Sequence, residues 1–316
     1  MSSSCTCVVF AKRGLATAVN KKDQKPVPPA ALGAEPATLT PDDDPRQALA
    51  AWMARPDNKF FAPSLVNRYW KHFFGRGLVD PEDDIRETNP ATNPELLDAL
   101  AKDFVASKFD LKHVVRTICK SSTYQLSSTP NRYNAADKQS FSRYYPRRLA
   151  AEVLLDAVND VTKANQAFTN LPANTRAVQL PDNSFNAENY FLTVFGRPEG
   201  SSACECERSM DASLAQSLHL FNSGDVQTKL TADTGRAATL AGEKDSRSDE
   251  AKVRELYLRT FARQPDADEL KLADEYIAKP RKAADGKPLA AAAAKRQGYE
   301  DLVWALINTK EFLFNH

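Results

Sequence analysis

The amino-acid sequence predicts a mainly α-helical protein with long loops. Segments with the apolar spacing of amphipathic helices recur along its 316 residues. Prolines, of which there are 19 against 11 glycines, mark the connections between these segments, and Ala and Leu are abundant within them. Residues 190–195, Tyr-Phe-Leu-Thr-Val-Phe, have strand-like propensity. We therefore expect an irregular multi-helix fold with at most this one short strand.

The domain organisation is predicted from a change in composition near residue 44. Residues 1–43 are expected to be an extended or disordered lead-in, because they include a segment rich in lysine and proline. Residues 44–316 are expected to form a single helical domain. Its middle, residues 162–208, is predicted to be irregular because prolines interrupt it and long apolar runs are few.

Capping residues predict where several helices begin. Short polar side chains that accept hydrogen bonds from free backbone N–H groups are favoured at these positions. The predicted N-caps are Asp44, Asn93, Asp110, Ser248 and Asp266. Glu269 completes a capping box with Asp266. A further helix, Pro63 to Phe74, is expected to end at Gly75, and Trp304 is expected to be a core or interface residue of the last helix.

Three charged residues follow one another at four-residue spacing in a helix that we expect to begin at Pro146. They are Arg148, Glu152 and Asp156. Two carboxylates on one helical face are compatible with acid–base chemistry or with a metal ion. A ladder of ion pairs, on the surface or between domains, is the simpler interpretation.

Charge and hydropathy exclude several functional classes. The formal net charge is +1, so no strong field is expected to attract nucleic acid or a membrane surface. No apolar run approaches the roughly 18–20 residues that span a bilayer. The first ten residues lack the basic lead-in and the apolar core of a secretory signal. The sequence therefore predicts no transmembrane segment, no nucleic-acid partner and no export signal.

The stretch from Phe195 to Ser223 holds the densest group of chemically capable side chains. It reads Phe-Gly-Arg-Pro, then a polar loop, then Cys-Glu-Cys-Glu-Arg, then a predicted helix. The candidate functional residues are Arg197, Cys204, Cys206, Glu207 and Arg208. In the helix, Leu214, Leu218 and Phe221 are expected to form the buried face. Gln216 and His219 are expected on other faces.

The two thiols of the Cys-x-Cys pair have four interpretations. Both are reduced and structural, or they form a labile disulfide with each other or with Cys119. A metal site is a weak third possibility, because zinc sites usually separate their cysteines by two to four residues. It would need further ligands from Cys5, Cys7 or His219.

The fourth interpretation is a catalytic thiolate. Arg197, Arg208 or the N-terminus of the following helix would lower the pKa of the thiol. No cofactor is expected in this chain, since it contains no Cys-x-x-Cys-His motif for attaching a c-type haem. No metal is expected either, and Cys204 and Cys206 are weak candidates for ligands.

At seven places the chain resembles the planctomycete PSD-one domain family, whose members have no established reaction. The matching segments are residues 67–79 (NRYWKHFFGRGLV), 93–98 (NPELLD), 122–125 (STYQ), 146–149 (PRRL), 195–198 (FGRP), 204–208 (CECER) and 304–312 (WALINTKEF). The resemblance covers roughly residue 25 to the C-terminus. It implies a setting in the periplasm or cell envelope and a protein partner that is a c-type cytochrome module. We expect the chain to depart from the family in lacking its upstream cytochrome-like domain and an export signal.

Two hypotheses about function follow. The first is a scaffold or docking module beside a c-type cytochrome or another envelope protein. The second is an enzyme, either a thiol redox protein or a hydrolase of envelope polysaccharide, centred on the candidate residues. A deep pocket that converges on these side chains would favour the enzyme. A flat surface with buried, mutually paired Arg and Glu would favour the scaffold.

Overall fold

The computed structural model describes residues 17–165, 167–199 and 213–315. These residues form thirteen α-helices and only two sheets, each of two short strands, so the predicted mainly α-helical fold is confirmed. Their contacts divide the chain into two compact units, which join at the Tyr145–Pro146 bond. The single domain predicted for residues 44–316 has no boundary there. Each unit is described by itself below.

The N-terminal unit combines a small hairpin with four helices. Its elements are β1 (Ala18–Val19), β2 (Pro26–Val27), α1 (Pro45–Met53), α2 (Phe61–Phe74), α3 (Pro94–Ala106) and α4 (Leu111–Lys120). The predicted caps are confirmed at Asp44, Asn93 and Asp110, each of which accepts a backbone N–H bond at its helix start. Gly75 ends α2 in the left-handed region, with φ of +77°.

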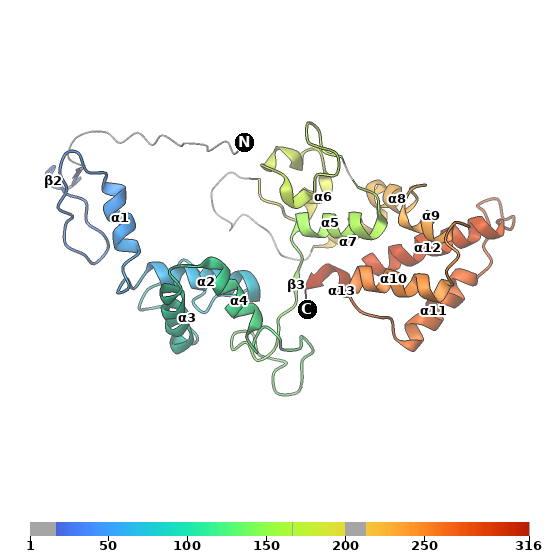
Figure 1. Cartoon of the computed structure of the whole chain (residues 1–316), viewed down its shortest axis with the longest axis horizontal. Helices are drawn as coiled ribbons and strands as arrows, with labels where there is room; N and C mark the ends of the chain where they lie inside the picture. The colour runs from blue at the N-terminus through green and yellow to red at the C-terminus, as the bar shows by residue number, and fades with distance from the viewer. Residues whose placement is uncertain (1–16, 166, 200–212, 316) are drawn as a thin grey trace. The chain divides into compact units, whose positions relative to one another are not determined.

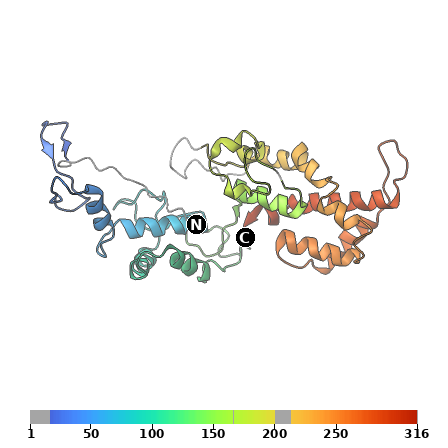
Figure 2. The same cartoon turned by 45° about the horizontal axis from the view of Figure 1, so that its top comes forward.

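Helices α2, α3 and α4 enclose the core of this unit and pack side by side (Figures 1 and 2). The core is aromatic: Trp70 and Phe74 of α2 stack with ring centroids 4.2 Å apart. Phe104 of α3 and Ile118 of α4 are 1% exposed. Aromatic side chains bury much apolar area per residue and therefore stabilise a small core effectively.

A buried asparagine fixes the loop that follows α2. The Asn67 side chain is fully buried. Its Nδ2 donates to the Val79 carbonyl at 2.8 Å, and its Oδ1 accepts from the Val79 N–H at 3.0 Å. Gly77 passes so close to this pair that a Cβ there would lie 3.0 Å from Asn67 Oδ1. The hydrogen bonds of Asn67 and the close approach of Gly77 therefore give these two residues of the 67–79 segment a structural role.

The C-terminal unit is larger and almost entirely helical. Its elements are β3 (Arg147–Arg148), α5 (Ala151–Thr162), η1 (Ala177–Gln179), η2 (Asn183–Asn186), α6 (Tyr190–Val194), α7 (Leu214–Asn222), α8 (Gly224–Leu230), α9 (Arg236–Ala241), α10 (Asp249–Phe261), α11 (Ala267–Ala278), α12 (Ala291–Ile307), α13 (Lys310–Leu313) and β4 (Phe314–Asn315). The predicted cap at Ser248 and the capping box of Asp266 with Glu269 are confirmed.

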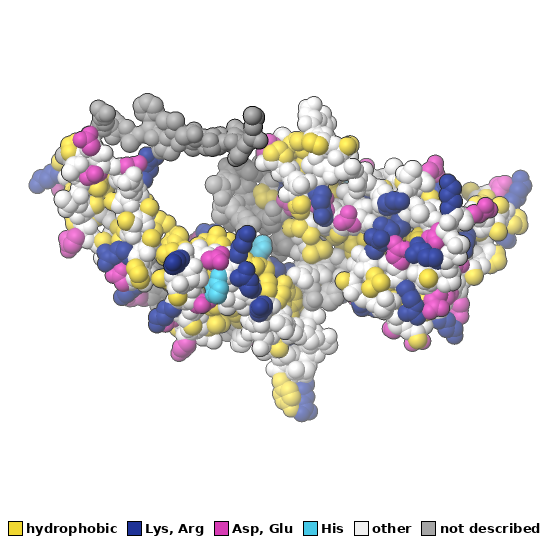
Figure 3. Space-filling model, viewed as in Figure 1, with side chains coloured by type: hydrophobic (Ala, Val, Ile, Leu, Met, Phe, Trp, Pro, Cys, Tyr) yellow, Lys and Arg dark blue, Asp and Glu magenta, His cyan; other side chains and the backbone are white. Residues whose placement is uncertain are grey.

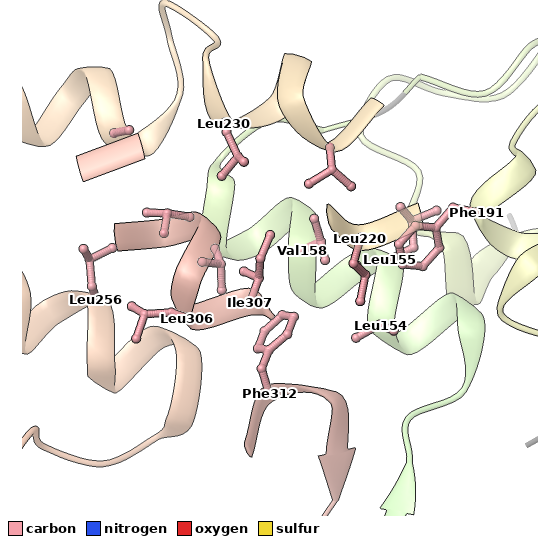
Figure 4. Close-up of a cluster of buried hydrophobic side chains, with 14 of the residues drawn as sticks. Leu154, Leu155, Val158, Phe191, Leu220, Leu230, Leu256, Leu306, Ile307 and Phe312 are labelled. Carbon is pink, nitrogen blue, oxygen red and sulfur yellow. The ribbon is translucent and has the colours of Figure 1, made fainter. Parts of the chain in front are cut away.

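Helix α5 lies at the centre of the C-terminal core. Leu154, Leu155 and Val158 are at most 1% exposed, and they lie among side chains from α6, α7 and the last helices (Figure 4). The chain enters α5 through β3, which pairs antiparallel with β4 in the register Arg147–Asn315 and Arg148–Phe314. The helix predicted to begin at Pro146 thus begins at Ala151, because the preceding residues are held extended by this pairing.

The predicted strand at residues 190–195 is wrong. Tyr190–Val194 forms the short helix α6. The Asn189 side chain accepts from the Phe191 N–H and so begins a helical turn, which buries Phe191 and Leu192 against α5. Strand propensity over six residues is a weak preference, and packing with a local cap overrides it here.

Charge on the described surface is mixed in sign. Figure 3 shows acidic and basic side chains lying next to one another on the visible face of the C-terminal unit. Among the described residues, no helix has both the length and the apolar character needed to cross a membrane.

One arginine joins three elements of the C-terminal unit. Arg263, which follows α10, donates from Nε to Glu311 of α13 at 2.6 Å and from Nη1 to Glu269 of α11 at 2.8 Å. Bonding to Arg263 is the first cause that holds the pKa of Glu269 below its usual range.

We expect Arg263→Met to lower the free energy of unfolding by about 1 kcal/mol at neutral pH. The loss is no larger because the ion pairs of Arg263 with Glu269 and Glu311 are partly exposed to solvent. A lowered carboxyl pKa stabilises the fold above the unfolded value, about 4.3, and this contribution is lost as pH falls. Urea titrations from pH 7 to pH 3 should therefore show the difference between wild type and variant shrinking below pH 4.5. Lys271→Met, which breaks an exposed pair, is the control. A difference independent of pH would contradict the assignment.

Candidate functional site

Arg197 is the one predicted site residue that lies within the described ranges. It follows α6 at a turn in which Gly196 has φ of +79°, a conformation that glycine adopts without steric cost. The Arg197 N–H donates to the Leu192 carbonyl at 2.9 Å, and Phe195 is buried at 1% exposure. The Phe-Gly-Arg-Pro sequence therefore closes α6 and directs the arginine side chain into the unit.

The Arg197 guanidinium has three partners, which lie in α5, in η2 and directly after η1. Nε lies 3.4 Å from Oε1 of Glu152 in α5, and the two side chains are only 8% and 13% exposed. Nη1 donates to Asn186 Oδ1 in η2 at 3.0 Å, and Nη2 donates to the Leu180 carbonyl at 3.4 Å. Asn186 in turn donates to the Pro198 carbonyl at 3.1 Å. This network holds the residues that lead up to the Cys-x-Cys segment.

Two of the family-like segments meet at Phe195. Arg148, from the Pro-Arg-Arg-Leu segment, donates from Nη2 to the Phe195 carbonyl at 3.0 Å. Its guanidinium carbon lies 5.4 Å from the centre of the Phe195 ring, a cation–π arrangement. Arg148 is 5% exposed. The two segments thus form one buried structural contact, for which the sequence offered no signal beyond their separate presence.

The predicted ladder of Arg148, Glu152 and Asp156 does not form. Arg148 lies before α5, and Glu152 pairs with Arg197. Asp156 is 3% exposed and accepts from the Ala177 N–H at 2.7 Å and the Val178 N–H at 3.2 Å. The Asp156 carboxylate in α5 thus caps the start of the short helix η1, which lies about 20 residues later in the sequence. The four-residue spacing of charges along α5 does not predict this contact.

The predicted buried face of α7 is also wrong. Gln216 and Leu220, at 7% and 2% exposure, face the core. Gln216 is held there because its Nε2 donates to the Val194 carbonyl at 3.2 Å. Leu218 and Phe221 are instead 51% and 45% exposed, while the Leu214 side chain lies outside the described ones.

His219 of α7 lies among aromatic rings. Its ring centre is 5.6 Å from those of Tyr190 and Phe191 and 6.4 Å from that of Phe195. Burial among these rings lowers the pKa of His219, and Asp225 opposes the shift. The side chain packs α7 against α6 and Phe195.

The remaining candidates, Cys204, Cys206, Glu207 and Arg208, lie outside the described residues, as do Cys5 and Cys7. The four interpretations of the thiols therefore stay predictions. Within the described ranges, no group of three or more His, Cys, Asp or Glu is arranged to hold a metal ion. Cys119, at the end of α4, is a free cysteine of intermediate burial.

Comparison with known proteins gives one match. The family model PSD1, described as a protein of unknown function (DUF1553), matches residues 45–277. No curated protein and no solved structure matches the chain. Helices α12 and α13 lie beyond the matched residues, yet Tyr299, Ile307 and Phe312 from these helices are buried in the same core as α5.

Proposed function

Because the chain belongs to the PSD1 (DUF1553) family of unknown function, we propose that it acts as a docking or scaffold module and not as an enzyme. The observation that carries the proposal is the pair of Arg197 and Glu152. Each side chain is at least 87% buried, and each faces the other. An arginine that recognises a substrate needs donors directed at that substrate. This guanidinium instead pairs with Glu152 and donates to Asn186 and to the Leu180 carbonyl, all within its own unit.

The exposed side of α7 is the proposed docking face. Phe221 follows Leu218 by three positions, so both side chains lie on one side of the helix. Phe221 contacts Trp304 of α12, with ring centroids 5.3 Å apart. Exposed apolar and aromatic side chains of this kind are favoured in protein interfaces. We define the docking face by Leu218, Phe221 and Trp304.

The proposed partner is a c-type cytochrome module or another protein of the cell envelope. This assignment rests on the resemblance of the motif segments. The haem would belong to the partner, since this chain contains no Cys-x-x-Cys-His motif. The chain would contribute the apolar docking face and the rigid support that α5, α6 and α7 give to it.

Immobilised protein exposed to an envelope fraction of the source cells tests this proposal. Covalently attached haem survives denaturing electrophoresis, so a captured c-type cytochrome is detected by haem staining. We expect Leu218→Asp with Phe221→Asp to reduce the captured haem by roughly tenfold or more, because buried charges weaken an apolar contact.

Leu272→Asp is the matched control, because Leu272 is a 70% exposed leucine of α11 outside the docking face. It should capture as much haem protein as wild type. Failure of the wild-type protein to capture a haem-bearing protein would contradict the cytochrome partner. Equal capture by the double variant would contradict the docking face.

A further inference from the structure

A second feature of the C-terminal unit is a polar pocket at the end of α5. It has a volume of about 550 Å³. Its lining residues come from α5, from the residues that follow it, and from α9 and α10: Asn159, Asp160, Lys163, Asn165, Arg236 and Arg259. None of these residues belongs to the Arg197 network or to the docking face. The pocket therefore needs an explanation of its own.

Positive charge in the pocket exceeds the negative charge available to balance it. Arg236 donates to Glu255 Oε1 at 3.2 Å, and Arg259 donates to the same oxygen at 2.7 Å. Glu255 also accepts from Arg247 at 2.7 Å, and Arg247 pairs in addition with Asp245 at 2.6 Å. Asp160, the acidic residue of the lining, is 70% exposed and pairs with Arg176.

The environment of Arg236 reflects this surplus. Its side chain is 11% exposed, and it donates to the carbonyls of Val161 at 2.7 Å and Asp160 at 3.0 Å. Burial and then the positive charge of Arg259 lower the pKa of Arg236. Glu255, which accepts from both guanidinium groups, opposes this effect, and a second anion beside them would add to its attraction.

An unsatisfied acceptor lies in the same pocket. Asn159 is 7% exposed, and its Oδ1 has no hydrogen-bond partner among the described residues. Buried side-chain oxygens are nearly always bonded, so an orphan that lines a pocket indicates a donor supplied from outside the chain. Water or a ligand group that carries an N–H or O–H supplies such a donor.

We propose that this pocket binds a small hydroxylated oxyanion. The carboxylate or phosphate group of the ligand interacts with Arg259 and Lys163. A hydroxyl group of the same ligand donates to Asn159 Oδ1. Cations supply the attraction, and the single amide acceptor supplies the preference for a ligand that also has a hydroxyl group.

Calorimetric titration of the full chain with four probes tests the proposal. D-Glucuronate and glucose 6-phosphate combine an anionic group with hydroxyls, acetate lacks the hydroxyl, and glucose lacks the charge. We expect at least one of the first two to bind roughly tenfold more tightly than acetate and glucose. The difference between the first two distinguishes a carboxylate ligand from a phosphate ligand.

Variants assign the two contacts separately. Arg259→Gln should weaken binding of every anionic probe about tenfold, whereas Asn159→Ala should remove only the preference for the hydroxylated anion over acetate. Arg254→Gln, on the same helix but outside the pocket, should bind as wild type does. Thermal unfolding without ligand checks that each variant folds, and Lys163→Gln replaces Arg259→Gln if the latter does not.

Three results would overturn the proposal. They are the absence of saturable binding by all four probes at millimolar concentration, binding without preference over acetate or glucose, and binding unchanged by the folded Arg259 or Lys163 variant.

Discussion

Replacing Gly77 with alanine is expected to destabilise the N-terminal unit by about 3 kcal/mol or more. The new Cβ would overlap the Val79 carbonyl oxygen and would approach Asn67 Oδ1 to 3.0 Å. The loop would have to move away from α2, and the two hydrogen bonds between Asn67 and Val79 would be lost. A fully buried amide would then be left without partners, which is itself costly.

Hydrogen exchange of the backbone N–H groups in residues 61–79, together with urea unfolding, measures this effect. Gly224→Ala is the control, because a Cβ there has no atom within 4 Å and the position begins a helix. It should leave stability unchanged or raise it slightly. Unchanged hydrogen exchange in Gly77→Ala would contradict the prediction that the loop after α2 is held in place by the hydrogen bonds between Asn67 and Val79.

Replacing Glu152 with glutamine is expected to destabilise the C-terminal unit by about 3 kcal/mol. The change leaves the Arg197 guanidinium, 8% exposed, without its anionic partner. Removing one member of a buried ion pair costs more than removing both, because the remaining charge stays desolvated. The double variant Glu152→Met with Arg197→Met should therefore recover much of the loss.

Urea unfolding of Glu152→Met, Arg197→Met and the double variant gives the coupling free energy between the side chains. Glu250→Gln, which breaks an exposed pair with Arg254, should change stability by less than about 0.5 kcal/mol. If the double variant is as unstable as the sum of the single variants, the two side chains are not coupled, and the main observation behind the scaffold proposal fails.

Local signals in the sequence predicted much of the helical fold. A cap such as Asn93 or Asp266 accepts a hydrogen bond from an N–H group two or three residues later. The start of the helix can therefore be predicted from residues that are adjacent in the sequence. The presence and order of the helices followed from such signals and from apolar spacing. Membership of the PSD1 family was likewise predictable from short ordered segments.

Long-range partners could not be predicted in this way. Arg197 was recognised as a candidate, but its partner Glu152 lies in another helix, and four-residue spacing assigned that carboxylate to a ladder. In α7, a glutamine takes a core position because a carbonyl of α6 is available to it, and two apolar residues are displaced to the surface. Helical periodicity assumes that only apolar residues face inward, and buried hydrogen bonds violate this assumption.

The pairing of β3 with β4 has a consequence for the order in which the C-terminal unit folds. The two strands come from opposite ends of that unit's sequence. A ribosome therefore releases α5 early, while the strand that pairs with its lead-in segment and the buried Phe312 emerge last. Contacts between distant residues require closure of a long loop before they stabilise anything. The unit accordingly reaches its final core only after the chain up to Asn315 has been synthesised, and until then α5 exposes apolar surface that a chaperone would have to protect.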